Sequence, residues 1–206
     1  LVHLSCLARC RARVSDLDGA RRAAAGLERF RLAMEVNVTA IWHLSKLCAP
    51  SMIERGEGSI VNVASMAGHI GLPLGGAYTA TKHALIGLTK TLALELGPHG
   101  IRAIAICPDD IATDMADLGM DLATEQLGLD PSARESLAPL HAIALRRRGE
   151  AVEVGRAVAW LASSGASYTS GESIVIDGAL MEGLQRQLRR KSLQLRLDRR
   201  NHVQLG

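Results

Sequence analysis

The fold is decided by the stretch GSIVNVASMAGHIGLPLGGAYTATKHALIGLTK, residues 58–90. Small, β-branched and apolar residues fill positions 59–64 between two glycines, which predicts a buried parallel strand. From Ala77 the small and apolar residues recur at helical spacing. They are Ala80, Ala84, Gly87, Leu88, Leu92 and Leu96. The stretch therefore predicts a strand, a glycine-rich loop and a helix, with Ser65 at the carboxyl end of the strand. Before it, residues 20–55 are predicted to be helical, with the helix broken or adjusted around 36–39. After it, the patterns predict strands at 101–107 and 173–176 and an amphipathic helix at 150–163.

Tyr78 and Lys82 lie one turn apart on the same face of the predicted helix. An ammonium group close to a phenol favours the phenolate, so it lowers a pKa that starts at about 10. A tyrosine whose pKa is lowered in this way can give or take a proton near neutral pH. The pair therefore predicts acid/base chemistry at the start of the helix.

The YxxxK spacing alone is a weak motif, and its context strengthens it. Ser65 stands thirteen residues before Tyr78. The accompanying segments, in chain order, are EVNVTA (35–40), GSIVNVAS (58–65), IRAIAICP (101–108) and SGESIVIDGAL (170–180). In these residues and in this order, the chain resembles the short-chain dehydrogenase/reductase family over residues 27–180.

The resemblance implies an α/β fold with a Rossmann-like parallel sheet in three layers. It also implies an oxidoreductase that transfers a hydride between NAD or NADP and a secondary alcohol or ketone. Ser65 would then hydrogen-bond the substrate oxygen, Tyr78 would transfer the proton, and Lys82 would lower the tyrosine pKa and hold the nicotinamide ribose. Asn37 matches the family's asparagine, whose backbone carbonyl helps to hold a proton-relay water against the lysine.

The segment CPDDIATDM, residues 107–115, stands where the family has a PG motif whose following residues approach the nicotinamide. With the lysine, the matching residues make up the predicted cofactor site: Lys82, Pro108, Ile111 and Thr113. Asp109 replaces the glycine, which normally permits close backbone approach. Thr113 also suits the N-cap of a following short helix, and the two roles can coexist.

A dinucleotide fold of this family starts with a strand, a glycine-rich turn of the TGxxxGIG kind and a helix whose N-terminus receives the pyrophosphate. The sequence holds no such motif, nor the residue that selects NAD or NADP. The resemblance therefore implies the second half of the sheet, with the N-terminal strands and the glycine-rich turn missing, and weak cofactor binding by this chain alone. The alternative is a non-catalytic relative that cannot hold a cofactor.

Three parts are expected along the chain: an unassigned basic segment (1–26), the catalytic half-domain (27–180) and a basic extension (181–206) whose pattern settles on neither helix nor strand. The net charge of +3 hides an uneven distribution, namely +4 over 1–33, −6 over 34–180 and +5 over 181–206. The basic ends could touch nucleic acid or acidic lipid, but they lack interleaved aromatic residues. Solvated ends are therefore favoured, and no nucleic-acid partner is expected.

The four cysteines form no CxxC pair. Cys48 and Cys107 lie within apolar helix and strand patterns, so they are expected to be reduced packing residues. His3, Cys6 and Cys10 lack a fourth ligand nearby, so no metal site is expected. There is no run of eighteen apolar residues and no signal-peptide pattern, so no membrane span is expected and the cytoplasm is the default location.

Three further features have consequences for function. HLSC, residues 3–6, stands where the family has NNAG at a strand end, so it is either a diverged end of that strand or unrelated sequence. Residues 116–145 correspond to the segment that closes over the substrate, and their apolar side chains either contact a hydrophobic substrate or pack the segment down. The resemblance also implies a homo-oligomer, formed through the two long helices that flank the serine strand.

Overall fold

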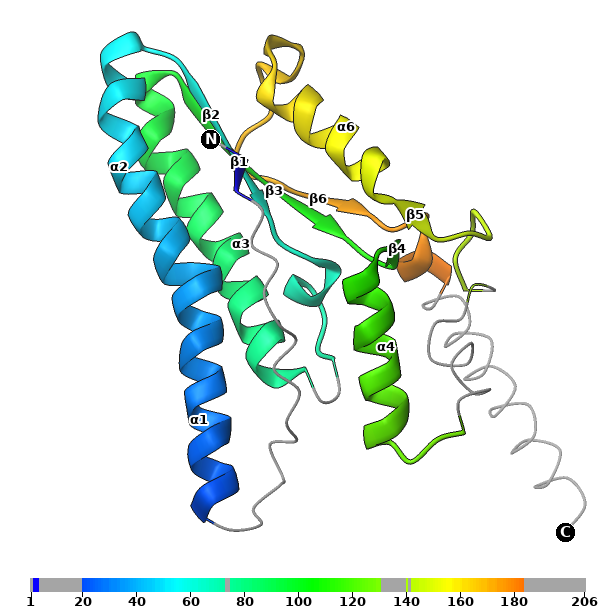
Figure 1. Cartoon of the computed structure of the whole chain (residues 1–206). Coiled ribbons are helices and arrows are strands. Elements are labelled where there is room, and N and C mark those ends of the chain that lie inside the picture. Colours follow the sequence, from blue (N-terminus) through cyan, green and yellow to red (C-terminus); the bar gives the residue numbers. More distant parts are fainter. Residues whose placement is uncertain (1, 4–19, 73–74, 131–139, 141, 184–206) are drawn as a thin grey trace, which may run out of the picture.

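The main sheet has four parallel strands in the order β1, β2, β3, β6 (Figure 1). The computed structural model describes residues 2–3, 20–72, 75–130, 140 and 142–183. Its strands are β1 (Val2–His3), β2 (Gly58–Val63), β3 (Ile101–Pro108) and β6 (Ser173–Ile176). The strands expected near 59–64, 101–107 and 173–176 are confirmed, and so is the α/β fold with a parallel sheet.

Helices cover both faces of this sheet and make three layers (Figure 1). One face carries α1 (Ala20–Met34), α2 (Ala40–Arg55) and α3 (Gly76–Leu96), and the other carries α6 (Ala151–Ala162). Side chains along β3 alternate between the two cores, as the pleat of a strand requires. Ala103, Ala105 and Cys107 face α2 and α3, whereas Ile104 and Ile106 face α6.

In the first helical layer, α1 and α2 form one continuous long helix (Figure 1). A π-helical turn, η1 (Glu35–Thr39), interrupts it between them. The sequence predicted an adjustment of the helix around residues 36–39, and this is confirmed. Helix α2 continues through Pro50 to Arg55 and stops at Gly56, whose φ of 69° suits a glycine. Because single π-helical turns are rare and often occur at functional sites, the turn singles out Asn37 within it.

Residues Val2 and His3 pair in parallel with Val61 and Asn62. This pairing favours the first reading of the HLSC segment, namely the end of a strand that precedes the long helix. Residues 4–6 of that segment lie outside the described residues. The expected boundary between residues 26 and 27 falls inside α1, which runs from Ala20 without a break. The extension expected from 181 is described only to residue 183.

The buried face of α3 differs from the one expected. Leu92 and Leu96 of the predicted stripe are buried, but Ala80 and Gly87 are exposed. Thr81, Lys82 and Thr89, which lie outside that stripe, are buried as well. The expectation assigned burial to small and apolar side chains, but here the polar groups find hydrogen-bond partners in the neighbouring elements. The helix was therefore predicted correctly, and its predicted stripe accounts for only part of the buried face.

A helix longer than expected follows β3. Helix α4 (Asp114–Gln126) occupies the first part of the segment in which the sequence showed no clear period. Before it, β4 (Ile111–Ala112) pairs in parallel with β5 (Gly149–Glu150), which leads directly into α6. Residues 131–139 and 141 of this segment lie outside the described residues.

Candidate active site

Ser65 follows β2 and begins a short 3-10 helix at residues 66–68. Its Oγ accepts a hydrogen bond from the Ala67 N–H at 3.1 Å, so the hydroxyl oxygen is fixed in place while its own hydrogen is still available. Gly68 lets this turn lie against α3, because a Cβ there would stand 2.9 Å from the Lys82 carbonyl oxygen. The strand end and the helix are thus held in close contact.

Lys82 is 1% exposed, an unusual position for an ammonium group. Its Nζ donates to the carbonyl oxygen of Val63 at 3.0 Å, and Val63 is the last residue of β2, two residues before Ser65. The same Nζ lies 5.5 Å from the centre of the Tyr78 ring, within cation–π range. Tyr78 itself is half-buried. The predicted Tyr–Lys pair is therefore a real contact, and it lies against the carboxyl end of β2.

Asn37 is fully buried in the π-helical turn and reaches the same helix. Its Nδ2 donates to Thr81 Oγ1 at 3.1 Å, and Thr81 Oγ1 donates to the Tyr78 carbonyl oxygen at 2.7 Å. Asn37 Oδ1 is buried with no hydrogen-bond partner. Thr81 was not predicted as a site residue, since a threonine between a tyrosine and a lysine carries no signal of its own. The relay role implied for the Asn37 backbone carbonyl stays a prediction.

Cys107 was predicted to be a reduced packing residue, and the structure places it beside the site. It is fully buried on β3, next to the end of β2, and its thiol is free. Burial raises the pKa of this thiol from 9.0 to about 11, opposed in part by the Ser65 backbone N–H and by the charge of Lys82. The thiol therefore stays protonated at neutral pH and acts as a small apolar contact.

The other predicted cofactor residues follow β3. Pro108 is the last residue of β3, and Ile111 lies in β4. Thr113 precedes α4, and its Oγ1 accepts from the Ala116 N–H at 3.3 Å, so the capping role suggested by the sequence is observed. Because β2 and β3 are adjacent and parallel, these residues leave the sheet at the same edge as Ser65.

An ion-pair cluster that the sequence did not indicate joins this loop to α4. Arg148 pairs with Asp110 and with Asp117, each at 2.9 Å. Burial disfavours the charge of Arg148, but the hydrogen bond to Asp117 and the nearby charge of Asp110 outweigh it, so the guanidinium pKa is raised. These residues are too far apart in sequence for their contact to be predicted from spacing.

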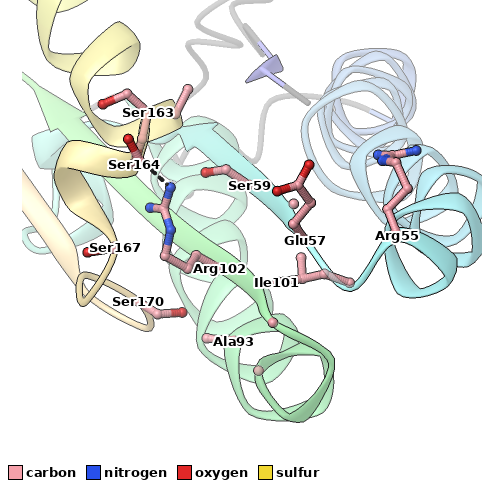
Figure 2. Close-up of a pocket in the computed structure, with 14 residues that line it drawn as sticks. Arg55, Glu57, Ser59, Ala93, Ile101, Arg102, Ser163, Ser164, Ser167 and Ser170 are labelled. Atoms are coloured by element: carbon pink, nitrogen blue, oxygen red, sulfur yellow. Dashed lines mark hydrogen bonds between the residues drawn. The ribbon is translucent and has the colours of Figure 1, made fainter.

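A cavity of about 630 Å³ lies at the opposite edge of the sheet, where β2 and β3 begin (Figure 2). Figure 2 shows serines around it and the Arg102 guanidinium at its wall, which donates to the carbonyl oxygens of Leu161 and Ser163. Its volume lies within the range of small-molecule pockets. None of the predicted catalytic or cofactor residues lines it.

Known proteins resemble this chain in sequence and in fold. The fold places Ser65, Tyr78 and Lys82 at the carboxyl edge of its parallel sheet. A family model described as enoyl-(acyl carrier protein) reductase matches residues 3–180. The chain belongs to the short-chain dehydrogenase/reductase family.

Individual relatives agree with this assignment. The 2,5-dichloro-2,5-cyclohexadiene-1,4-diol dehydrogenase of Sphingobium indicum is 41% identical over 157 residues, which make up 76% of this chain and 59% of the relative. The crystal structure of acetoin dehydrogenase from Enterobacter cloacae is 37% identical with a TM-score of 0.68, covering 88% of this chain and 64% of that one. A 4-hydroxyisoleucine dehydrogenase mutant, complexed with NADH and succinate, is 32% identical with a TM-score of 0.65, covering 73% and 58%.

The chain spans about three fifths of the length of the relatives it matches. Within the described residues, no helix has the length and apolar character needed to cross a membrane. Among the residues that the structure describes, no three or more His, Cys, Asp or Glu side chains are grouped so that they could hold a metal ion. Cys6 and Cys10 lie outside those residues.

Proposed function

We propose that the chain forms the catalytic part of an NAD- or NADP-dependent oxidoreductase acting on a secondary alcohol or ketone. The observation that carries the proposal is the buried Lys82, whose Nζ meets both the Tyr78 ring and the carbonyl oxygen at the end of the Ser65 strand. A buried ammonium group beside a half-buried phenol is costly to desolvate, and this arrangement serves acid/base catalysis. Asn37 supports it by fixing the helical turn between Tyr78 and Lys82.

The residues take different parts in this reaction. The Tyr78 hydroxyl gives its proton to the substrate oxygen during reduction and takes it back during oxidation. Ser65 Oγ, which accepts from the Ala67 N–H, donates its own hydrogen to the same substrate oxygen. Lys82 favours the phenolate through its charge. Bound nicotinamide dinucleotide supplies the hydride acceptor or donor.

The described residues fit the nicotinamide end of such a cofactor. Lys82 is an ammonium donor at the sheet edge, and Pro108, Ile111 and Thr113 leave the neighbouring strand at the same edge. The relative complexed with NADH supports a nicotinamide dinucleotide. The choice between NAD and NADP belongs to the adenosine ribose, for which the sequence holds no motif.

The apolar residues of α4 support a substrate with a hydrophobic body. Met115, Leu118 and Leu122 lie on one stripe of the helix and are 39%, 60% and 38% exposed. Their exposure favours contact with a substrate over packing of the segment, which was the other reading of their sequence. A stripe of this kind is available to contact an apolar alcohol or ketone.

We also propose that copies of the chain form a homo-oligomer through the long helices of the layer that α1, α2 and α3 make up. Large apolar side chains are exposed on this layer, namely Leu27, Phe30, Leu32, Trp42, Leu47, Ile53 and Leu94. Leu47 is 74% exposed on α2, where burial against a second copy would remove it from water. Sedimentation of Leu47→Glu should show a shift toward the monomer, and an unchanged oligomer would place the contact elsewhere.

The catalytic proposal is tested with Tyr78→Phe and the matched control Tyr168→Phe. Tyr168 is fully exposed, so its hydroxyl has no structural role to lose. We expect Tyr78→Phe to lower turnover of a secondary alcohol by about 100-fold to 10,000-fold, with the fold retained, and the control to be unaffected. Isothermal titration with NAD, NADH, NADP and NADPH measures binding separately. If no nucleotide binds and no variant turns over, the chain is the non-catalytic relative instead.

A further inference from the structure

Arg148 holds three separate groups with one guanidinium. Its Nε donates to Asp110 Oδ1 at 2.9 Å, its Nη1 to Asp117 Oδ1 at 2.9 Å, and its Nη2 to the Ile111 carbonyl oxygen at 3.0 Å. The side chains of Arg148 and Asp110 are only 24% and 13% exposed, so their attraction is screened less than that of a surface pair. A planar donor with three directed contacts fixes positions as well as charge.

The three partners belong to different parts of the chain. Asp110 lies in the turn after β3, Ile111 in β4, and Asp117 near the start of α4. Arg148 itself directly precedes β5, whose Gly149 N–H donates to the Asp110 carbonyl oxygen at 3.2 Å. Gly149 also packs closely on Ile111, because a Cβ at residue 149 would stand 2.6 Å from Ile111 Cδ1 and the end of that side chain would have to shift. The turn, the two-stranded sheet and the helix therefore meet at Arg148.

The turn at Asp110 needs external support. Asp110 has a φ of 44°, in the left-handed region that few residues other than glycine adopt. Aspartate tolerates this region better than most residues, but at some cost in free energy. Its contact with Arg148 and the Gly149 N–H bond to its carbonyl both hold the strained conformation.

The neighbouring Arg147 provides an internal contrast. Its guanidinium donates to both carboxylate oxygens of Glu153 at 2.7 Å, and this pair is largely exposed. Glu153 lies in the first turn of α6, where it also accepts from the Glu150 N–H. Arg147 therefore stabilises the start of α6, whereas Arg148 reaches in the other direction, to β4 and α4.

We propose that Arg148 is a positioning residue that clamps the Asp110 turn, β4 and the start of α4 into one rigid body. The clamp keeps the apolar stripe of α4 in a fixed relation to Ile111 and Thr113. Its consequence for substrate binding rests on the proposed function, but the clamp itself does not. Arg148 touches no reacting group in this scheme and acts through the elements it joins.

The test is Arg148→Met in the full chain, with Arg147→Met as the matched control. Hydrogen–deuterium exchange of peptides from residues 108–126 reports the rigidity of the turn and of α4. We expect exchange there to rise about tenfold or more in Arg148→Met, because local opening no longer breaks three contacts. In Arg147→Met the rise should be confined to the start of α6. Equal exchange at 108–126 in both variants would overturn the clamp.

Two milder variants keep the test decisive if Arg148→Met does not fold. Asp117→Asn keeps the shape of the side chain but removes its charge, so exchange should rise in α4 and not in the Asp110 turn. Arg148→Lys keeps the charge but not the three directed donors, so it should restore only part of the protection. Unchanged exchange in both variants would overturn the clamp equally.

Kinetics separate the clamp from the proposed reaction. In Arg148→Met we expect the KM for an apolar ketone to rise about tenfold while kcat stays within about threefold, because binding geometry and not proton transfer is disturbed. An unchanged KM would overturn the positioning role. If the parent chain turns over no ketone, the proposed function fails, and the exchange measurement still decides the clamp.

Discussion

The two edges of the sheet are both polar, but they are polar in different ways. At the carboxyl edge, Lys82, Asn37 and Thr81 are almost completely buried, and their hydrogen bonds connect three elements. At the amino edge, serines and Arg102 surround an open cavity of about 630 Å³ (Figure 2). A volume of this size does not make a site by itself. Buried polar groups that converge on a reactive side chain are the better guide, since each must offset its desolvation.

The largest effect should come from exchanging one cation at each edge for methionine. Lys82→Met removes the ammonium group beside Tyr78 and should lower turnover by at least about 100-fold. Arg102→Met removes hydrogen bonds to the carbonyl oxygens of Leu161 and Ser163, and should lower the melting temperature while leaving turnover unchanged. Steady-state kinetics and thermal unfolding measure both. Equal loss of turnover would mean that the two edges are not functionally distinct.

The buried thiol at the carboxyl edge should be almost unreactive. With its pKa raised to about 11, Cys107 holds about 100-fold less thiolate at pH 8 than a thiol with the ordinary value of 9.0. Alkylation at pH 8, followed peptide by peptide, should therefore modify Cys107 far more slowly in the native than in the unfolded chain.

The same shift has a consequence for stability. The Cys107 thiol keeps its proton to a higher pH in the native chain than in the unfolded chain. Its contribution to the free energy of unfolding is therefore complete below pH 9 and is lost as the pH rises toward about 11. Cys107→Ala should reduce the loss of stability in that window. Rapid alkylation of the native chain at pH 8 would contradict both expectations.

A smaller effect is expected from Thr81→Val, with Thr91→Val as the control on the same helix. Thr81→Val leaves the buried Asn37 Nδ2 without its acceptor, which should cost about 1 to 3 kcal/mol of unfolding free energy. Thr91 makes only an exposed bond to the Gly87 carbonyl oxygen, so its loss should change stability little. Urea denaturation gives both values, and similar costs for the two variants would show that the Asn37 contact adds nothing.

The smallest effect is expected for an exposed ion pair at the carboxyl edge. The hydrogen bond from Arg147, followed by the Glu150 N–H, lowers the pKa of Glu153 from 4.5 to about 2. This group therefore adds stability above pH 4.5, and the contribution is lost as the pH falls toward about 2. Glu153→Gln should lower the melting temperature slightly at pH 7, because solvent screens the pair, and the difference should vanish at the acid end. A difference that does not depend on pH would assign the effect to the cap geometry alone.

The sequence by itself determined the order of the elements. Alternating and helical periods placed β2, α3, β3, α6 and β6, and the spacing of Ser65, Tyr78 and Lys82 indicated the family. These features are local, because a strand or a helix shows its period within a short window and Tyr78 and Lys82 are one helical turn apart. The adjustment of the long helix near Asn37 was likewise predicted from the residues around it.

Only the tertiary structure decided which polar groups are buried and what they touch. Nothing in the helical period marks Lys82 as more buried than Ala80, because burial depends on the π-helical turn and the strand end packed against that face. The Arg148 cluster is equally invisible in sequence, since Asp110 and Asp117 lie 38 and 31 positions before it. Long-range contacts of this kind arise from chain topology, and sequence periodicity carries no record of them.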